Sequence, residues 1–386
     1  MSKRPKIDHI ELFRGLAILA VLLIHVTSYP IILLPMHSTL YPLYHIVNTF
    51  SHFAVPAFIF LSALGMFYQY DDTRKPNWYS FYFKRFKVII IPYVLWSFFY
   101  YALVFYFSRK SLTEGSLSYF KGLLIGSNYA HLYFIIIIVQ FYLLFPLIHR
   151  LLLTKPLRSH IIAFGIAAQA IFYLANYNYL HLSKIGSIAA SYLLYYCLGA
   201  FVGLRMQSNN GTFHSGKWIY PTWLLFAVMY ASQMWMIRAN PHWVPRVWLS
   251  GINFVTDYSF SAISCLFLLQ LSQYLLNWRW HSVTKLLLSI GATSLGIYYV
   301  HPFLLLVWRA KFMSTQPILY HPLTWLGGIL ALALSWVFTL ILQRRKWGFL
   351  IVGKVVANKS NTDNLVIDQA HQSQAPSVSS GIEAKL

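Results

Sequence analysis

Charged residues, and acidic residues above all, are scarce in this sequence. Only 10% of the 386 residues are charged, with 9 Asp and Glu against 30 Lys and Arg. Hydrophobic residues make up 58% and aromatic residues 18%, which is too apolar for a soluble domain of this length. The composition therefore predicts an all-α integral membrane protein, because long apolar runs cross a bilayer as helices.

Cysteine is scarce as well. Cys197 and Cys265 are the only two, and they fall in separate apolar runs. This pattern argues against a disulfide framework and against a cysteine-based metal site, and no metal is expected. We expect both cysteines to be small, buried core residues.

The formal net charge of +21 comes mostly from Lys and Arg in short links between apolar runs. In a soluble chain this charge would suggest nucleic acid, but no basic stripe with interleaved aromatic residues lies outside the apolar runs. We expect membrane lipids as partners instead, because such links meet anionic headgroups. Nucleic acid is not an expected partner.

Ten apolar runs are candidates to cross a bilayer. They lie at approximately 12–34, 47–69, 87–108, 131–153, 158–177, 187–206, 218–237, 252–276, 284–307 and 323–343. With the N-terminus inside, 22 Lys and Arg lie on the cytoplasmic side and 8 on the other, so both termini are predicted to be cytoplasmic. Residues 1–355 form the predicted transmembrane domain, and the polar stretch 356–386 is expected to be a disordered cytoplasmic tail.

The first run, FRGLAILAVLLIH, has Arg14 near one end and His25 at the other. At 100° per residue this spacing makes about three turns, so both side chains lie on one face, about 16 Å apart. His25 would then lie deep in the membrane, where an ionisable side chain usually faces a cavity. Two plainer interpretations stay open: Arg14 anchors the helix to headgroups, and His25 is a hydrogen-bonded packing residue. Glu11 is one turn from Arg14, at a spacing that allows an ion pair.

An Arg, ten intervening residues and a His in the first membrane helix resemble the acyltransferase 3 family of membrane acyltransferases. Further motifs that resemble the family follow in order along most of the chain: FAVPAFIFLSALG (53–65), KRFKVIIIPY (84–93), HLYFIIIIVQFYLLFPL (131–147), YYCLGAFVGLR (195–205) and SLGIYYVHPFLL (294–305). Two positions depart from the family pattern. Ala63 replaces a glycine, and Val88 stands where a second arginine often follows Arg85.

The resemblance implies an acyltransferase (EC 2.3.1.-) in a bacterial plasma membrane. Such an enzyme moves an acyl group, usually acetyl, from cytoplasmic acyl-CoA to a hydroxyl of an envelope glycan or lipid-linked sugar. CoA carries phosphates, which the basic residues near the cytoplasmic ends of the first three helices would bind. These residues are Arg14, Lys84, Arg85 and Lys87. Anchoring to headgroups explains the lysines equally well.

Acyl transfer to a hydroxyl needs a base, and a neutral imidazole is well suited to accept the proton. His25 is therefore the predicted general base, with an acyl-histidine intermediate as the alternative. Asp257, a carboxylate well inside the eighth run, is the second candidate catalytic residue. It either holds the acceptor sugar, orients a histidine, or serves as a structural partner.

Ser62, Gln140 and His301 are candidate substrate-binding residues inside the bundle. Helix packing would explain Ser62 equally well, and His301 also fits a capping or interfacial role. His52 and His131 are expected near the outer surface, and the sequence assigns them no role.

Two other functions stay open. A secondary transporter or lipid flippase also has about ten helices with a few buried polar residues, and Pro56 is a candidate site for a broken helix. The sequence has no second interruption in a matching half, which argues against a transporter. A non-catalytic subunit of a polysaccharide-export system is the other alternative, because the resembled family has a polysaccharide-adhesin branch.

Overall fold

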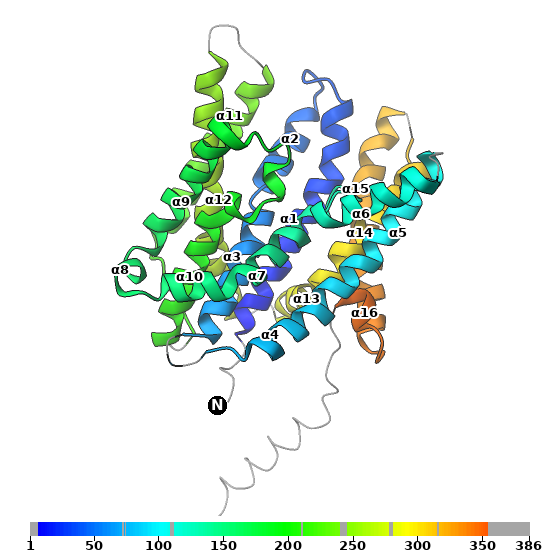
Figure 1. The fold of residues 1–386 in the computed structure, drawn as a ribbon. Helices are drawn as coiled ribbons and strands as arrows, with labels where there is room; N and C mark the ends of the chain where they lie inside the picture. Colours follow the sequence, from blue (N-terminus) through cyan, green and yellow to red (C-terminus); the bar gives the residue numbers. More distant parts are fainter. Residues whose placement is uncertain are drawn as a thin grey trace, which may run out of the picture.

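In the computed structural model, the described residues fold into helices and connecting turns, without a strand among them (Figure 1). The structure describes residues 7–71, 73, 75–108, 112–209, 211–239, 245–277, 281–314 and 316–353. The predicted all-α class is therefore confirmed. The predicted tail, 356–386, lies outside the described residues.

Within this part of the chain, eight helical segments are long and apolar enough to cross a membrane. They are α1 (Asp8–Leu33), α2 with α3 (Tyr41–Phe50 and Ala54–Gln69), α4 with a π-helix and α5 (Trp78–Arg85, Phe86–Ile90 and Ile91–Ser108), α7 (Tyr133–Leu152), α9 with a π-helix (Ile161–Ala175 and Asn176–Leu180), a 3₁₀ turn with α10 (Ala189–Tyr192 and Leu193–Ser208), α12 (Arg246–Leu276) and α15 (Pro317–Gln343).

A further span is formed if α13 (His281–Ala292) and α14 (Ser294–Lys311) are counted together. The remaining predicted run coincides with α11 (Ile219–Ala239), so each of the ten runs has a helical counterpart. The count of ten spans and the cytoplasmic termini stay predictions. Shorter helices are α6 (Leu112–Ile125), α8 (Lys155–Arg158) and α16 (Phe349–Val352).

Two predicted runs contain a break. A turn at residues 51–53 separates α2 from α3, and Pro56 lies in the first turn of α3, where a missing N–H costs no helical hydrogen bond. The run 284–307 was predicted as one helix, but α13 and α14 meet at an angle of 81°. Thr293 lies at this bend, and its Oγ1 donates to the carbonyl of Ser289 (2.8 Å). The chain therefore has a second interruption, which the sequence analysis missed.

Helix α1 runs through the middle of the bundle and contacts α2, α3 and α12 to α15 (Figure 1). Glycine allows two of the closest helix contacts. A Cβ atom at Gly291 on α13 would lie 1.8 Å from the Glu11 carbonyl oxygen, and one at Gly199 on α10 would lie 2.2 Å from the Phe60 carbonyl oxygen. Small residues let membrane helices approach at this distance. These contacts fix α1 and α3, which carry much of the candidate site.

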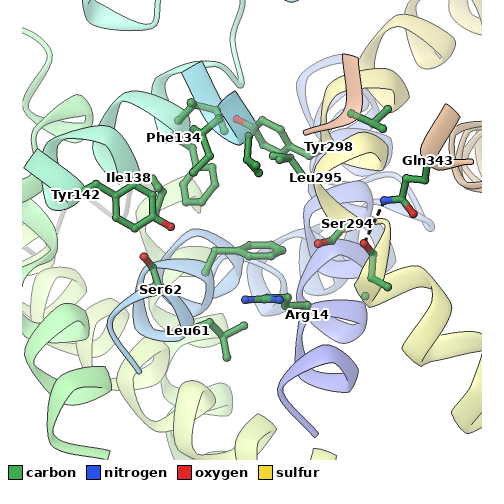
Figure 2. Close-up of a pocket in the computed structure, with 17 residues that line it drawn as sticks. Arg14, Leu61, Ser62, Phe134, Ile138, Tyr142, Ser294, Leu295, Tyr298 and Gln343 are labelled. Carbon is green, nitrogen blue, oxygen red and sulfur yellow. Dashed lines mark hydrogen bonds between the residues drawn. The ribbon is translucent and has the colours of Figure 1, made fainter. Parts of the chain in front are cut away.

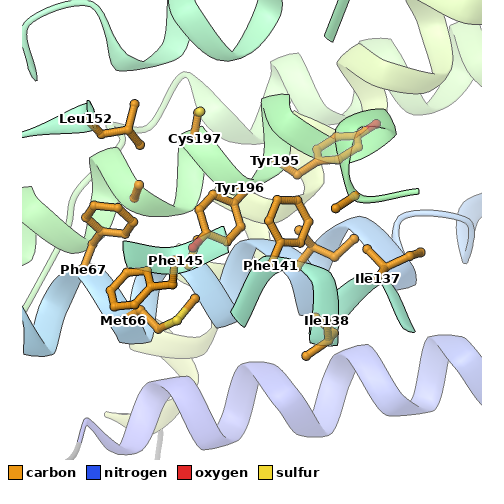
Figure 3. Close-up of a cluster of buried hydrophobic side chains, with 14 of the residues drawn as sticks. Met66, Phe67, Ile137, Ile138, Phe141, Phe145, Leu152, Tyr195, Tyr196 and Cys197 are labelled. Carbon is orange, nitrogen blue, oxygen red and sulfur yellow. The ribbon is translucent and has the colours of Figure 1, made fainter. Parts of the chain in front are cut away.

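Aromatic rings fill much of the core between α3, α7 and α10 (Figure 3). Phe141 and Tyr196 stack with ring centres 4.1 Å apart and an interplanar angle of 8°. Cys197 lies in the same cluster, and both cysteines are buried, as predicted.

The short helix α16 packs against α5 near the end of the bundle where α1 begins. The Trp96 indole donates to the carbonyl of Ile351 (2.8 Å), and Val352 is fully buried. Helix α16, which follows α15, is thus part of the packed domain.

Candidate functional site

Three cavities lie in a row beside α1. The basic-end cavity has a volume of about 240 Å³ and includes Arg14 in its wall. The histidine cavity, of about 110 Å³, is lined by His25 and His131. The tyrosine cavity, of about 330 Å³, is lined by Asp257, His52 and five tyrosines: Tyr133, Tyr173, Tyr192, Tyr195 and Tyr258.

Neighbouring cavities share walls. The basic-end and histidine cavities have Phe58, Phe134 and Tyr298 in common. The histidine and tyrosine cavities have Ile24, Val55 and Tyr133 in common. A row of pockets therefore leads from Arg14 past His25 to Asp257, separated by the side chains of these shared residues.

In the basic-end cavity, Arg14 on α1 and Ser62 on α3 line the same space (Figure 2). Arg14 Nη1 donates to Glu11 Oε1 at 3.0 Å, which confirms the ion pair allowed by the sequence spacing. The Arg14 side chain is 37% exposed, so solvent reaches it. The hydroxyl of Ser62 is buried and has no hydrogen-bond partner among the described residues.

The other predicted basic residues lie around this cavity and do not line it. The Arg85 guanidinium carbon lies 3.5 Å from the Phe81 ring centre and 5.0 Å from that of Tyr142, a wall residue of the cavity. Lys84 and Lys87 are exposed. Val88 stands where the family often has a second arginine. Its side chain lines the cavity, so the wall is apolar at this position.

His25 lies in a cluster of three histidine rings. Its ring centre is 5.1 Å from that of His301 and 6.3 Å from that of His131, and the latter two are 6.2 Å apart. His131 and His301 are almost completely buried. His301 therefore lies against His25 inside the bundle, and its candidate roles, substrate binding or a capping or interfacial position, stay predictions.

Hydrogen bonds hold the His301 ring and the backbone at His25 and His131 in place. His301 Nδ1 lies 2.7 Å from the carbonyl of Ile297, so Nδ1 carries the proton and Nε2 is left as an acceptor. The Arg309 guanidinium donates to the carbonyl of His25, and the Tyr298 hydroxyl donates to that of His131. The backbone around His25 is thus held from α14, while its ring borders the histidine cavity.

Asp257 is linked to a different histidine. The Tyr230 hydroxyl interacts with Asp257 and also lies 2.7 Å from His52 Nδ1. His52 Nε2 donates to Asn48 Oδ1 (3.1 Å), and Asn48 Nδ2 donates to Thr27 Oγ1 on α1 (2.9 Å). Among the described residues, Asp257 forms no ion pair, and the histidine to which Tyr230 links it is His52 and not His25, so its predicted role in orienting a histidine stays a prediction.

Gln140 has no free polar atom for a substrate. Its Nε2 donates to the carbonyl of Ser187 (2.8 Å), and its Oε1 accepts from the backbone N–H of Ala189 (2.9 Å). Gln140 therefore holds the backbone that leads into α10, and it is absent from the described walls of the three cavities.

His52 and His131 belong to the candidate site, although the sequence alone assigns them no role. Each stands directly before a long apolar helix, His52 in the turn before α3 and His131 two residues before α7. Both residues and His301 are predicted to lie near the outer ends of their apolar runs. This shared depth is the feature of the sequence that could have grouped the three histidines. Their contacts with Tyr230 and His25 depend on helices distant in the sequence.

Comparisons with known proteins identify the family of this chain. A family model described as an acyltransferase domain (Acyl_transf_3) matches residues 7–340. A protein of Bacillus subtilis (strain 168) named "Putative membrane-bound acyltransferase YfiQ" is 24% identical over 378 residues, which cover 92% of this chain and 96% of that protein. A Staphylococcus aureus protein (strain MSSA476) named "Probable poly-beta-1,6-N-acetyl-D-glucosamine export protein" is 27% identical over 168 residues, 40% of this chain and 44% of that protein.

No solved structure matches the chain. The family match spans every helix from α1 to most of α15, and it includes the residues that line the histidine and tyrosine cavities. Together with its apolar helices, the match makes this chain a multi-pass membrane protein that belongs to the acyltransferase 3 family.

Proposed function

We propose that this protein transfers an acyl group, acetyl in the first instance, from acyl-CoA to a hydroxyl of a cell-envelope glycan or lipid-linked sugar. The observation that carries the proposal is the row of three cavities with His25 at its centre. A half-buried base between two pockets suits a reaction that joins a donor from one side with an acceptor from the other.

The basic-end cavity is the proposed entry of the donor. Its volume of about 240 Å³ is below the roughly 300–1,000 Å³ of pockets that enclose whole drug-sized ligands, so it suits the thioester arm alone. The phosphates would stay at the mouth, where Arg14 is solvent-accessible and Arg85 lies behind Tyr142. The exposed positions of Lys84 and Lys87 favour a role in lipid anchoring for these two lysines.

The proposed step is direct transfer. The His25 ring accepts the proton of the acceptor hydroxyl while the hydroxyl oxygen attacks the thioester carbonyl carbon. The new C–O bond forms, the C–S bond breaks, and the CoA sulfur leaves as a thiolate that takes up a proton. An acyl-histidine intermediate is the alternative, in which the same ring is first acylated and then deacylated by the sugar.

Export is the second candidate function. The Staphylococcus aureus relative supports it by its name, and the breaks at residues 51–53 and Thr293 resemble the interrupted helices of transporters. The match to that relative covers 44% of its length, whereas the Bacillus subtilis match covers 96% of that protein. We therefore favour the enzyme.

The decisive experiment uses purified protein in lipid nanodiscs with radiolabelled acetyl-CoA and envelope glycans from the host. An acyltransferase moves the label to the glycan, and His25→Ala should lower this rate by about 10²–10⁴-fold, the usual contribution of a general base, without loss of the folded protein. His160→Ala, a change at an exposed histidine, is the matched control. Full activity of His25→Ala would rule out the assigned role, and a wild-type protein that moves no label would favour export.

A further inference from the structure

The tyrosine cavity has a composition that suits one class of ligand. We infer that it binds an uncharged sugar residue of the acceptor, with Asp257 accepting hydrogen bonds from its hydroxyls, and that it excludes acidic sugars. This inference rests on the proposed acyl transfer, and it specifies the acceptor that the sequence could not identify.

The aromatic part of the cavity is rigid. Tyr195 and Tyr258 stack with ring centres 5.8 Å apart at 8°, and the hydroxyls of Tyr258 and Tyr173 are 2.5 Å apart. A sugar ring has apolar C–H faces and hydroxyl edges, so tyrosine side chains, with an apolar ring and a polar tip, match it in both respects. A lipid chain would gain nothing from the hydroxyls.

The described wall of the cavity contains an acidic side chain, that of Asp257, and no Lys or Arg. Both ring nitrogens of His52 already have partners, Tyr230 and Asn48, so this ring offers no free donor to a bound anion. An ionised carboxylate only accepts hydrogen bonds, and sugar hydroxyls donate them. A ligand carboxylate or phosphate placed there would be repelled, since like charges interact strongly away from bulk water.

The cavity lies next to the proposed catalytic residue, which makes the bound sugar the acceptor of the acyl group. Val55 and Tyr133 separate the tyrosine cavity from the histidine cavity, so a sugar held by Asp257 is next to the space that His25 borders. Tyr258 also borders an apolar groove of about 420 Å³ along α9, α10 and α12. The sugar can therefore arrive attached to a membrane lipid or as part of a soluble glycan, and the test separates these sources.

The test measures binding and transfer in nanodiscs with two matched probes, radiolabelled decyl glucoside and decyl glucuronide, which differ only at C6, where the glucuronide has a carboxylate in place of the CH2OH group. A soluble glucose hexamer provides the arm without a lipid. We expect the wild-type protein to prefer the glucoside by at least about 100-fold in Kd and in kcat/KM. Asp257→Asn should weaken glucoside binding by about 10- to 100-fold and reduce the preference over glucuronide at least tenfold. Asp71→Asn, the same change outside the three cavities at a residue whose Oδ1 acceptor for Thr73 the amide retains, should match the wild type.

The outcomes separate the inference from the proposed function. Equal binding of the two probes, an unchanged preference in Asp257→Asn, or no binding of any sugar probe would overturn the inference, even where acetyl groups still reach a glycan. Selective binding without transfer from acetyl-CoA would contradict the proposed function and leave the sugar site in place. A glucose hexamer that binds as well as the decyl glucoside identifies a soluble acceptor.

Discussion

The imidazole rings of His25 and His301 lie with their centres 5.1 Å apart, although the residues come from the first long helix and from α14 near the other end of the chain. His301 Nδ1 is fixed by the carbonyl of Ile297. The buried ring of His301 therefore limits the orientations that the His25 ring can adopt.

His301→Gln should lower kcat by about 10- to 100-fold and change the KM for acyl-CoA by less than about twofold. The amide of Gln can still donate to Ile297, so folding is preserved, but its shape no longer supports the His25 ring. Steady-state kinetics with radiolabelled acetyl-CoA measure both constants. An increase in KM with an unchanged kcat would contradict the positioning role.

Arg14 and Glu11 provide a pair of opposite tests. Arg14→Ala should raise the KM for acyl-CoA by about 10- to 100-fold, because a hydrogen bond to a charged partner is lost. Glu11→Gln should lower the same KM, because it removes a negative charge 3.0 Å from the arginine that binds a polyanion. A KM that rises in Glu11→Gln would show that Glu11 mainly holds Arg14 in position.

Lys84→Ala and Lys87→Ala should leave the KM for acyl-CoA within about twofold of the wild type. Both lysines are exposed, and neither lines the basic-end cavity, so each contributes only a screened attraction to the phosphates of the donor. Lys155→Ala, at a basic residue of α8, is the control for general surface charge. A tenfold effect of either change would mean that these lysines bind the donor directly.

The fold was predictable because its signals are local. Apolar runs identify membrane helices one at a time, and the spacing of Arg14 and His25 needs only the geometry of one helix. The bend at Thr293 was not visible, because the flanking segments are equally apolar. The partners of His25 and Asp257 were also hidden, since the rings of His131 and His301 and the hydroxyl of Tyr230 come from segments far apart in the sequence. Gln140 is a reasonable substrate-binding candidate from the sequence, because the backbone groups that bind its amide, at Ser187 and Ala189, are far away in the chain.

Val55→Trp should stop transfer to sugars and spare donor binding. Val55 stands between the histidine and tyrosine cavities, and an indole at this position would fill the passage between them. We expect sugar acylation to fall by more than about 100-fold, with acyl-CoA binding within about twofold of the wild type, since a 1 Å misplacement alone can cost about 10²-fold. Val337→Trp, at a position 46% exposed on α15, is the matched control. Undiminished acylation in Val55→Trp would mean that the acceptor reaches His25 by another route.

Gly199→Ala should destabilise the protein by about 2 kcal/mol or more, because the new methyl group would meet the Phe60 carbonyl and force α10 away from α3. Gly65→Ala is the matched control on α3, since a Cβ there meets nothing within 4 Å. That change should be neutral or stabilising by up to about 1 kcal/mol through helix propensity. Thermal unfolding in detergent measures both, and equal Tm values for the two variants would contradict the close helix contact.

The contact between Trp96 and Ile351 has a practical consequence for anyone who shortens this chain. The family match ends at residue 340, yet Gln343 and Val352 help to enclose the pocket beside Arg14. A truncation designed from sequence similarity would remove one side of that pocket, and the resulting loss of activity would resemble a defect in catalysis. Expression tags and stop codons therefore belong after Gly353.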